Sequence, residues 1–324
     1  MKILVTGSSG FIGSHLTEYL VEKGYKVVAF DRYNSNSDYG WLENSKYKKK
    51  INFILGDIRD YDSVHKAMKG CSGVMHLAAL IGIPYSYLSP TAYIKTNVEG
   101  TLNVIEAAKN LKLKQVIITS TSEVYGSANK KKLNENDELK AQSPYAASKI
   151  AADQLSLSYF RSFGLPIKII RPFNTFGPWQ SARAVIPTIL TQALTNNKIK
   201  IGNLNSVRDF LFVKDLCSAY EKIYKSNKLF GEVINVGSDK EISIKKLIYK
   251  ISKRLKKKIN IVVDKKRIRP SLSEVKRLKC DNKKIKKFTR WKPQHTLDEG
   301  LQNFIEWLNQ DKNLKKYKPK EYNI

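Results

Sequence analysis

The sequence predicts an α/β protein with a doubly wound parallel sheet and a smaller, mixed α/β C-terminal domain. Two observations predict this fold class. Through about residue 170, short β-branched apolar runs alternate with helical patterns, as βαβ units require. These runs are apolar almost without interruption, which is typical of parallel strands that are covered on both faces.

The first domain is expected to contain six such strands and four helices before the pattern changes. The expected strands are 2–6, 26–30, 51–55, 73–78, 114–120 and 166–171, and the expected helices are 11–23, 60–69, 91–110 and 144–163. After Arg171 the chain is turn-rich ("RPFNTFGPWQ") and its elements are shorter. We expect the run 232–237 to return to the first sheet. The predicted domains are therefore 1–171 plus about 209–238, and 172–208 plus 239–324.

The charge of the chain is strongly positive and unevenly distributed. The net charge is +29, and residues 245–290 hold 20 Lys or Arg against 3 Asp or Glu. Such a balance can indicate nucleic-acid binding. However, the lysines follow ordinary helix and strand patterns without interleaved aromatic residues, so no nucleic-acid partner is expected. Two interpretations of the positive charge remain. The lysines form a solvated surface, or their electric field attracts an anionic substrate, and both can be true together.

The length, hydrophobic content and cysteine content favour a cytoplasmic protein of two globular domains. The 324 residues are 42% hydrophobic, enough for a sizeable core. The chain enters an apolar strand at once, without the pattern of a signal peptide, and no apolar run approaches the length of a membrane span. Cys71, Cys217 and Cys280 are far apart and show no metal or disulfide spacing, which fits reduced thiols. No metal site is predicted.

A glycine-rich turn follows the first expected strand. "VTGSSGFIG" places Gly7, Gly10 and Gly13 where a strand passes into a helix. Glycines allow the backbone to approach a pyrophosphate, and the helix N-terminus supplies N–H donors. Asp31 ends the second strand, near the spacing expected for a carboxylate on the adenosine ribose. This carboxylate repels a 2′-phosphate and so favours NAD over NADP, although the neighbouring Arg32 weakens that preference. The sequence therefore predicts a Rossmann-type, NAD-binding sheet.

Two further stretches contain residue types suited to acid/base chemistry. "TSTSEVYG" places Thr121, Ser122 and Glu123 at the end of the fifth strand, where α/β proteins hold ligands. We expect Thr121 and Glu123 to face the same side of an extended strand. "SPYAASK" places Tyr145 and Lys149 four residues apart, on one face of a helix. A nearby ammonium and the positive nicotinamide would favour the phenolate, which could act as a base.

Together, these motifs resemble the extended branch of the short-chain dehydrogenase/reductase superfamily, the nucleotide-sugar epimerases and dehydratases. The segments that carry the resemblance are "TGSSGFIG", "GDIRD", "HLAAL", "TNVEGT", "SPYAASK" and "RPFNTFGP". The resemblance covers nearly the whole chain. The cofactor-binding residues that it implies are Gly7, Gly10, Phe11, Ile12, Gly13, Asp31, Arg32, Asp57, Ile58, Leu77, Ala78, Ala79, Asn97, Tyr145 and Lys149. Of these, Asp57 and Ile58 would flank the adenine, and Asn97 would lie near a ribose.

The resemblance also implies a reaction for the catalytic residues. Tyr145 would take the proton of the C4 hydroxyl during oxidation, with Thr121 hydrogen-bonded to the same hydroxyl. Glu123 would then remove the acidified C5 proton, the C6 hydroxyl would leave as water, and hydride would return to C6. The triplet Thr121, Ser122 and Glu123 departs from the Thr-Asp-Glu of dTDP-glucose dehydratases. Either Ser122 relays the proton for the leaving hydroxyl through water, or Glu123 performs both tasks.

Within the branch, the chain is most similar to the configuration-retaining N-acetylglucosamine 4,6-dehydratases of legionaminic acid pathways. "ALIGIPYSYLSP", "RPFNTFGPWQSARAVIPTI", "VRDFLFVKDL" and "RIRPSLSEVKRL" carry this similarity. By resemblance, Asn174, Arg183, Arg208 and Arg269 would bind the sugar diphosphate, and guanidinium groups suit phosphate oxygens. GDP and UDP sugars both fit. The resemblance further implies a homodimer or a dimer of dimers, formed through helices 95–110 and 144–163.

Three other functions remain open at this stage. A UDP-glucuronate decarboxylase shares the Thr-Ser-Glu triplet but requires a cation for the sugar carboxylate, and no dedicated one is evident in the sequence. A nucleotide-sugar 4-epimerase uses the same C4 oxidation, although simple 4-epimerases of this branch lack the carboxylate. A non-catalytic NAD-binding protein that binds a partner through its basic face would not require Tyr145, Lys149 and Glu123 together.

Overall fold

A seven-stranded parallel sheet forms the centre of the N-terminal lobe. The computed structural model describes residues 1–127, 130–310 and 312–322. In spatial order the strands are β11 (Glu232–Val236), β6 (Ile167–Pro172), β5 (Gln115–Thr119), β4 (Gly73–His76), β1 (Lys2–Thr6), β2 (Lys26–Arg32) and β3 (Ile51–Gly56). Every neighbouring pair is parallel. The sheet is therefore the predicted Rossmann-type sheet, and residues 232–236 return to it as expected.

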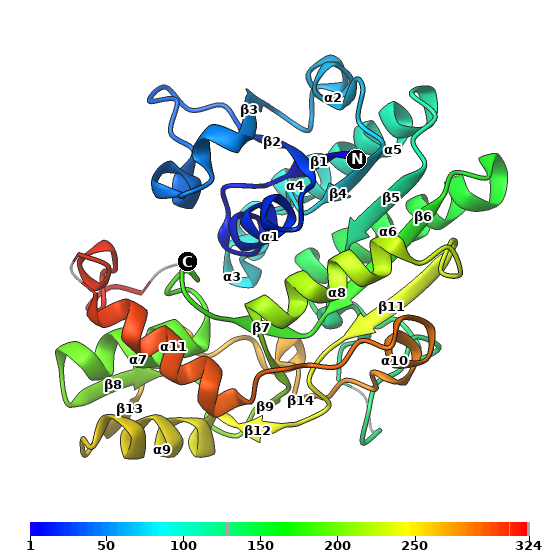
Figure 1. The fold of residues 1–324 in the computed structure, drawn as a ribbon. Helices are drawn as coiled ribbons and strands as arrows, with labels where there is room; N and C mark the ends of the chain where they lie inside the picture. Colours follow the sequence, from blue (N-terminus) through cyan, green and yellow to red (C-terminus); the bar gives the residue numbers. More distant parts are fainter. Residues whose placement is uncertain (128–129, 311, 323–324) are drawn as a thin grey trace.

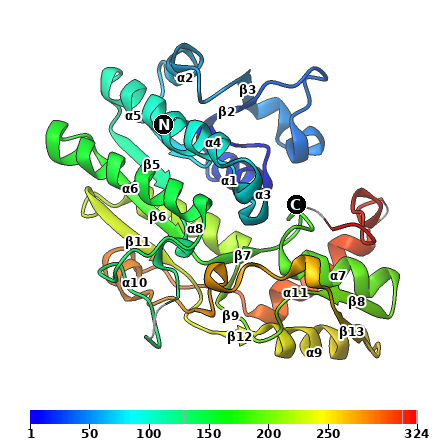
Figure 2. The ribbon, with the colours of Figure 1, turned by 180° about the vertical axis from the view of Figure 1, so that it is seen from behind.

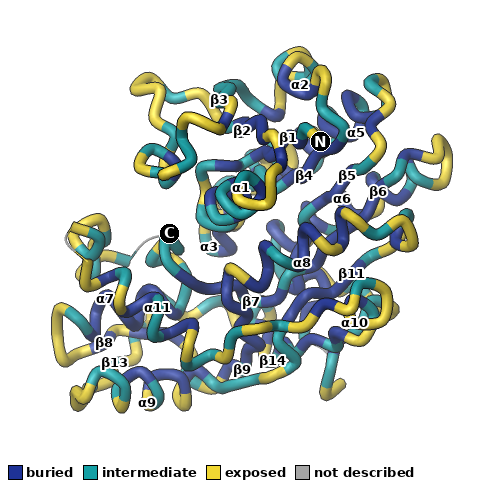
Figure 3. The backbone as a smooth tube through the Cα atoms, in the orientation of Figure 1, coloured by how far each residue is buried: buried dark blue, intermediate teal, exposed yellow. Residues whose placement is uncertain are grey.

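Helices cover both faces of this sheet. Helices α1 (Phe11–Glu22) and α8 (Val213–Lys225) pack together on the face toward the viewer in Figure 1. On the opposite face, seen in Figure 2, lie α2 (Tyr61–Met68), α5 (Gly100–Asn110) and α6 (Pro144–Phe163). The tube in Figure 3 is buried along most of the strands between these layers, which explains their uninterrupted apolar sequences.

The expected helix 91–110 is not a single α-helix. Helices α3 (Ile83–Leu88) and α4 (Pro90–Tyr93) precede a π-helical segment at Ile94–Glu99, and α5 begins only at Gly100. A π-helical turn displaces side chains from regular α-helical positions and often occurs at functional sites. Here it places Asn97 inside the protein, beside the loop that follows β4.

The sequence determines where α6 begins and ends. Ser143 accepts a hydrogen bond from the Ala146 N–H through its side chain, and Pro144 occupies the first helical turn. Both features favour a helix start. The helix ends at Gly164, whose φ of 65° lies in the left-handed region. Tyr145 and Lys149 therefore lie in the first two turns, next to the carboxyl ends of the strands.

In the part that the structure describes, the C-terminal lobe is built from smaller sheets and four α-helices. Its strands are β7 (Asn174–Phe176), β8 (Lys198–Ile201), β9 (Val207–Arg208), β10 (Phe210–Phe212), β12 (Ile242–Ser243), β13 (Asn260–Val263) and β14 (Arg277–Leu278). They pair as β10–β7, β12–β9–β14 and β13–β8. The helices are α7 (Val185–Thr195), α9 (Ile244–Leu255), α10 (Lys283–Thr289) and α11 (Leu297–Asn309). This lobe is mixed α/β, as predicted.

Short 3-10 turns connect these elements. They are Gly40–Asn44, Lys48–Lys50, Ser122–Tyr125, Lys265–Arg267, Ser271–Ser273 and Leu314–Lys316. None of the helices in the described ranges is both long enough and apolar enough to span a membrane.

A row of aromatic rings joins the two lobes. His15 on α1 stacks on Trp179 of the C-terminal lobe, with ring centroids 4.1 Å apart. Trp41 of the N-terminal lobe lies 5.9 Å from Trp179 and 5.6 Å from Trp307 on α11, centroid to centroid. Trp179 has a φ of 71°, a rare backbone conformation for a bulky residue. The rings of His15 and Trp41 pack against Trp179, and this packing holds Trp179 in the rare conformation.

Candidate active site

In the glycine-rich turn after β1, Gly7 and Gly13 pack tightly against protein backbone, whereas Gly10 is accessible from outside. Gly7 has a φ of 68°, and a Cβ there would lie 2.8 Å from the backbone nitrogen of Ala78. A Cβ on Gly13 would lie 2.0 Å from the Gly7 carbonyl oxygen. A Cβ on Gly10, by contrast, would meet only that oxygen, at 3.4 Å, and Gly10 is exposed. The turn thus presents bare backbone at Gly10 and the start of α1, with Phe11 and Ile12, toward a ligand.

Asp31 at the end of β2 is held by the same turn. The Ser9 N–H donates to Asp31 Oδ2 at 2.8 Å, and the Ser8 hydroxyl donates to the same oxygen. Burial raises the pKa of the Asp31 carboxyl, while the two serine contacts oppose this shift. Arg32 is exposed. The second oxygen of Asp31 makes none of these bonds, so the carboxylate is oriented and still able to accept hydrogen bonds from a ribose.

The other predicted dinucleotide residues follow β3 and β4. Asp57 is paired with Arg59, which holds the pKa of the carboxyl below its usual range. Ile58 is buried against Gly100, where a Cβ would lie 2.6 Å from the Ile58 side chain. Leu77, Ala78 and Ala79 are half-buried at the end of β4, opposite the glycine turn.

Asn97 is held inside the protein by hydrogen bonds to two other segments, and its expected place near a ribose of the dinucleotide stays a prediction. Its Oδ1 accepts from the Leu80 N–H at 2.8 Å, and its Nδ2 donates to the Leu80 carbonyl and the Ser148 hydroxyl, both at 2.9 Å. The side chain is fully buried. Asn97 therefore fixes the loop after β4 to helix α6, and its polar atoms are already engaged by protein groups.

Tyr145 lies in a buried pocket of mixed character. It packs with Ile83 and Tyr93, and the ring of Tyr93 meets it edge-on at 6.2 Å between centroids. Burial raises the pKa of Tyr145 well above its usual value, the neighbouring Thr121 hydroxyl lowers it, and the carboxylates of Glu123 and Asp153 raise it further. These groups keep the phenol protonated at neutral pH, so its activation requires positive charge in the site.

Lys149 is the nearest source of that charge on the same helix. Its side chain is buried, and burial lowers the pKa of the ammonium to about 8, while the carboxylate of Asp153 opposes the shift. At neutral pH Lys149 therefore remains mostly protonated. His76 on β4 lies close enough to feel this charge; burial and Lys149 lower the pKa of His76 to about 3. His76 is thus a neutral ring between the Thr6 and Thr101 hydroxyls, at 2.7 and 3.1 Å.

Glu123 does not lie on an extended strand, so the expectation that Thr121 and Glu123 face the same side of such a strand is wrong. Strand β5 ends at Thr119, and Ser122–Tyr125 form a 3-10 turn. The Glu123 N–H donates to the Thr121 hydroxyl oxygen at 3.2 Å, so the threonine side chain caps this turn. Thr121 and Ser122 are buried, and the Glu123 side chain is 13% exposed. The triplet nevertheless lies at the carboxyl end of β5, close to Tyr145.

Two of the predicted arginines lie beside this triplet. Arg269 Nη1 is 3.9 Å from Glu123 Oε2, and this buried nitrogen has no hydrogen-bond partner among the described residues. Arg208 is also buried, and its Nη2 lies 3.5 Å from Glu274 Oε1. Burial lowers the pKa of the Arg208 guanidinium, and the charges of Glu123 and Glu274 oppose this shift. The decarboxylase hypothesis lacked a cation near Glu123, and the structure provides one in Arg269.

Asn174 and Arg183 lie on the adjoining part of the C-terminal lobe. Asn174 is in β7, and its buried Oδ1 is without a hydrogen bond in the described structure. Arg183 is exposed and reaches the N-terminal lobe, where a Cβ on Gly82 would lie 3.0 Å from Arg183 Nη1. Arg208 and Arg269 thus lie near Glu123, and Arg183 lies near Gly82, although the sequence separates these residues widely; that all four bind the sugar diphosphate stays a prediction.

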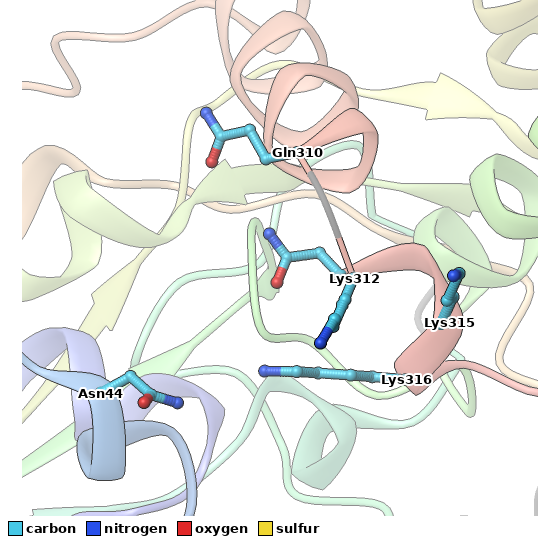
Figure 4. A pocket seen from close by; sticks show the side chains of 6 residues that line it. Asn44, Gln310, Lys312, Lys315 and Lys316 are labelled. Carbon is cyan, nitrogen blue, oxygen red and sulfur yellow. The ribbon is translucent and has the colours of Figure 1, made fainter.

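The hollow drawn in Figure 4 lies elsewhere. It is lined by Asn44 and by residues of the C-terminal segment, Gln310, Lys312, Asn313, Lys315 and Lys316. None of the predicted site residues lines it, and its lining side chains are amides and lysine ammonium groups without a carboxylate. Among the described residues there is also no cluster of three or more potential metal ligands.

This geometry agrees with the comparison with known proteins. Residues 4–304 match the family model described as GDP-mannose 4,6 dehydratase. The chain belongs to this family.

Relatives in the family have several different activities. The chain is 34% identical to a dTDP-D-glucose 4,6-dehydratase from Dictyostelium discoideum over 75% of this chain and 59% of the relative. It is 32% identical to a UDP-N-acetyl-alpha-D-glucosaminuronate decarboxylase from Bacillus cytotoxicus, over 96% of this chain and 99% of the relative. It is 31% identical to a UDP-glucuronate 4-epimerase from Thermodesulfobacterium geofontis, over 95% and 96%. The chain matches 47% of the length of a trifunctional relative from Arabidopsis thaliana.

Solved structures of the family share the whole fold. Pal from Bacillus thuringiensis has a TM-score of 0.88 at 32% identity, covering 95% of this chain and 99% of its own. A dTDP-glucose 4,6-dehydratase from Bacillus anthracis, solved with NAD, has 0.85 at 29% identity, covering 99% and 100%. A UDP-glucuronic acid 4-epimerase from Bacillus cereus, solved with UDP-glucuronic acid and NAD, has 0.87 at 29%, covering 96% and 99%.

The sequence missed several residues that complete the site of this family member. Ser8 and Ser9 orient Asp31, Tyr93 packs on Tyr145, and Glu274 accompanies Arg208. These contacts join segments that are distant in sequence. Asp153 lies four residues after Lys149, so the spacing that relates Tyr145 to Lys149 also predicts Asp153 on the same face of the helix.

Proposed function

We propose that the protein is an NAD-dependent nucleotide-sugar 4,6-dehydratase acting on GDP- or UDP-N-acetylglucosamine. The observation that carries this proposal is Glu123, a carboxylate at the end of β5 that is close enough to influence the pKa of Tyr145. The open backbone at Gly10 and the oriented Asp31 fit a dinucleotide with free ribose hydroxyls. Bound NAD supplies the redox chemistry by taking a hydride from C4 and returning it to C6.

Tyr145 is the base for the C4 hydroxyl in this proposal. Lys149 follows Tyr145 by four residues on α6, so its ammonium would stabilise the phenolate against burial and the nearby carboxylates. Thr121 lies beside Tyr145 and can hydrogen-bond the same hydroxyl. The low exposure of Tyr145, Thr121 and Ser122 keeps water from the oxidised carbon.

Glu123 then removes the proton from C5, which the C4 ketone has made acidic. The electrons of the broken C–H bond form the C5–C6 double bond, and the C6 hydroxyl leaves as water with one added proton. That proton comes either from Glu123 itself or through Ser122 and a water molecule. When the hydride returns to C6, C5 takes up one proton that has exchanged with solvent, which completes the 4-keto-6-deoxy sugar. Arg269 places a positive charge 3.9 Å from the Glu123 carboxylate, at the position where this proposal puts the C5 proton transfer.

The substrate diphosphate would bind between the lobes. Arg208 and Arg269 lie beside the triplet, and Arg183 reaches across from the C-terminal lobe. Asn174 has a free amide oxygen that can accept a hydrogen bond from a hydroxyl of the substrate. Guanidinium groups bind phosphate oxygens in a bidentate manner. The high positive charge of the C-terminal lobe would also attract this dianionic substrate.

A decarboxylase that acts on a nucleotide-diphospho uronic acid is the second candidate. The observation that favours it is again the pair formed by Arg269 and Glu123, because Arg269 Nη1 is free to bind a C6 carboxylate. A 4-epimerase is the third, as a relative and a solved structure carry that activity. The experiment is incubation with GDP- and UDP-N-acetylglucosamine and with the corresponding uronic acids, with mass spectrometry of the products. Loss of water supports the proposal; loss of carbon dioxide or an isomer of unchanged mass rejects it.

We also propose that the protein acts as a homodimer through α6 and the segment before α5, which can pair further into a dimer of dimers. Ala147 and Ala151 are exposed on α6, and Phe163 and Ile94 are 59% and 47% exposed. Small and apolar residues on an exposed helix face fit close packing against a second copy. Sedimentation should give at least a dimer at micromolar concentration, and a monomer alone would reject this proposal.

A further inference from the structure

Asp153 is a buried carboxylate that the proposed reaction does not use. It is fully buried on α6, and its Oδ2 accepts from the Ser120 hydroxyl at 2.8 Å. The same oxygen accepts from Arg171 Nε at 3.1 Å and Nη2 at 2.9 Å. Its other oxygen, Oδ1, is buried without a hydrogen bond among the described residues. Burial raises the pKa of the Asp153 carboxyl, and the charges of Arg171 and Lys149 oppose this shift, so the ionised form depends on positive charge nearby.

The helix supplies that charge. Tyr145, Lys149 and Asp153 follow one another at intervals of four residues, so they form one row along α6. All three are buried. The other charged or titratable groups near Lys149 and Tyr145 are His76 on β4, which is neutral, Arg171 on β6, Glu123 after β5, and Tyr93 on α4. Of the groups that influence Lys149, Asp153 is the carboxylate on its own helix.

We propose that Asp153 is a positioning residue, whose carboxylate holds Lys149 as an ammonium beside Tyr145 and fastens α6 to the end of β5. The second task follows from Ser120, which directly precedes the triplet of Thr121, Ser122 and Glu123. One side chain thereby links both segments that carry the acid/base groups. This inference rests on the proposed function for its kinetic consequences, but the state of Lys149 can be measured without turnover.

Arg171 makes the arrangement rigid. Its Nη1 donates to the Tyr125 hydroxyl at 3.0 Å, and that hydroxyl donates to Asn235 Oδ1 on β11 at 2.7 Å. Asp153 is thus anchored to two strands of the sheet as well as to Ser120. Without its carboxylate, Lys149 would be a buried cation with no carboxylate partner on its helix, and burial would favour the neutral amine.

The test measures the titration of Lys149 by competitive labelling of the folded protein with acetic anhydride across pH, with peptide mass spectrometry. In the native protein Lys149 should titrate near 8. In Asp153→Asn the pKa of Lys149 should fall by at least one unit. In Asp153→Glu, which keeps a carboxylate, the pKa of Lys149 should stay close to its native value. Lys168 is an internal control, because burial also lowers its pKa to about 8 but its partners are Gln115, Ile223 and Tyr224. Its titration should not change.

Further variants separate charge from fold. Ser120→Ala removes one hydrogen bond and keeps the carboxylate, so Lys149 should titrate as in the native protein. If Asp153→Asn does not fold, Asp153→Asn/Arg171→Met removes both charges and should still lower the Lys149 pKa. In active variants the alkaline fall of kcat should move to lower pH with little change in KM. An unchanged Lys149 titration in every folded variant without Asp153 would overturn the inference, whatever the substrate proves to be.

Discussion

Arg269 Nη1 lies 3.9 Å from Glu123 Oε2, and the two residues come from different lobes of the protein. The pair brings a guanidinium and a carboxylate together at the carboxyl end of β5, where Tyr145 is also found. A cation there can bind a phosphate or a sugar carboxylate. The pair is therefore central to both leading proposals for the reaction.

Replacement of Arg269 by methionine should weaken substrate binding. We expect KM for the nucleotide sugar to rise at least tenfold, since a charged hydrogen bond contributes about 1.5–3 kcal/mol. Dinucleotide affinity should not change, because Arg269 does not border the glycine turn. Steady-state kinetics and a binding titration check both expectations. Lys266→Met, which removes an exposed charge from the same region, is the matched control and should behave as the native protein.

The glycine turn should respond differently at its two positions. Gly13→Ala places a Cβ 2.0 Å from the Gly7 carbonyl oxygen, so the fold itself should be destabilised. Gly10→Ala has space in the protein but intrudes where a pyrophosphate would lie. This variant should melt as the native protein does and bind dinucleotide at least tenfold more weakly. Native affinity in folded Gly10→Ala would contradict the assignment of the cradle.

His15 should make stability depend on pH. Burial and the charge of Lys214 lower its pKa to about 4, although the ring bonds the Pro178 carbonyl at 3.0 Å. The unfolded chain therefore binds the proton more readily, and folding stability is lost as pH falls from about 6.5 toward 4. The slope can approach about 1.4 kcal/mol per pH unit. Urea unfolding at pH 7 and pH 5 should show a smaller loss for His15→Phe than for the native protein; equal losses would show that another group is responsible.

The sheet could be predicted from the sequence because its information is local. Each buried strand is an apolar run, and the alternation with helices dictates parallel order around β1. The glycine turn and Asp31 follow from spacing along one βαβ unit. The same reasoning correctly placed Tyr145 and Lys149 on one helix, because α6 has clear start and stop signals.

The substrate side of the site could not be predicted in this way. The contact between Arg269 and Glu123 depends on how the second lobe folds back, for which no short-range pattern exists. The chain does not continue as an extended strand to Glu123, because the Thr121 hydroxyl caps a 3-10 turn there. This side-chain hydrogen bond competes with the backbone hydrogen bonds that would extend β5. The π-helical segment that buries Asn97 likewise depends on contacts with Leu80 and Ser148.

The most direct test of the proposed dehydration compares Glu123→Gln with Tyr145→Phe. Glu123→Gln keeps the shape of the side chain and removes the base, so substrate should still be oxidised at C4 and the reaction should stop there. On addition of substrate, the absorbance of reduced nicotinamide should rise and persist, turnover should fall by about 10²–10⁴-fold, and deuterium from solvent should not enter C5. Tyr145→Phe should show little of this absorbance, because it fails earlier. Dehydration by Glu123→Gln at near the native rate would contradict the account, because the carboxylate beside Arg269 would then not be the base.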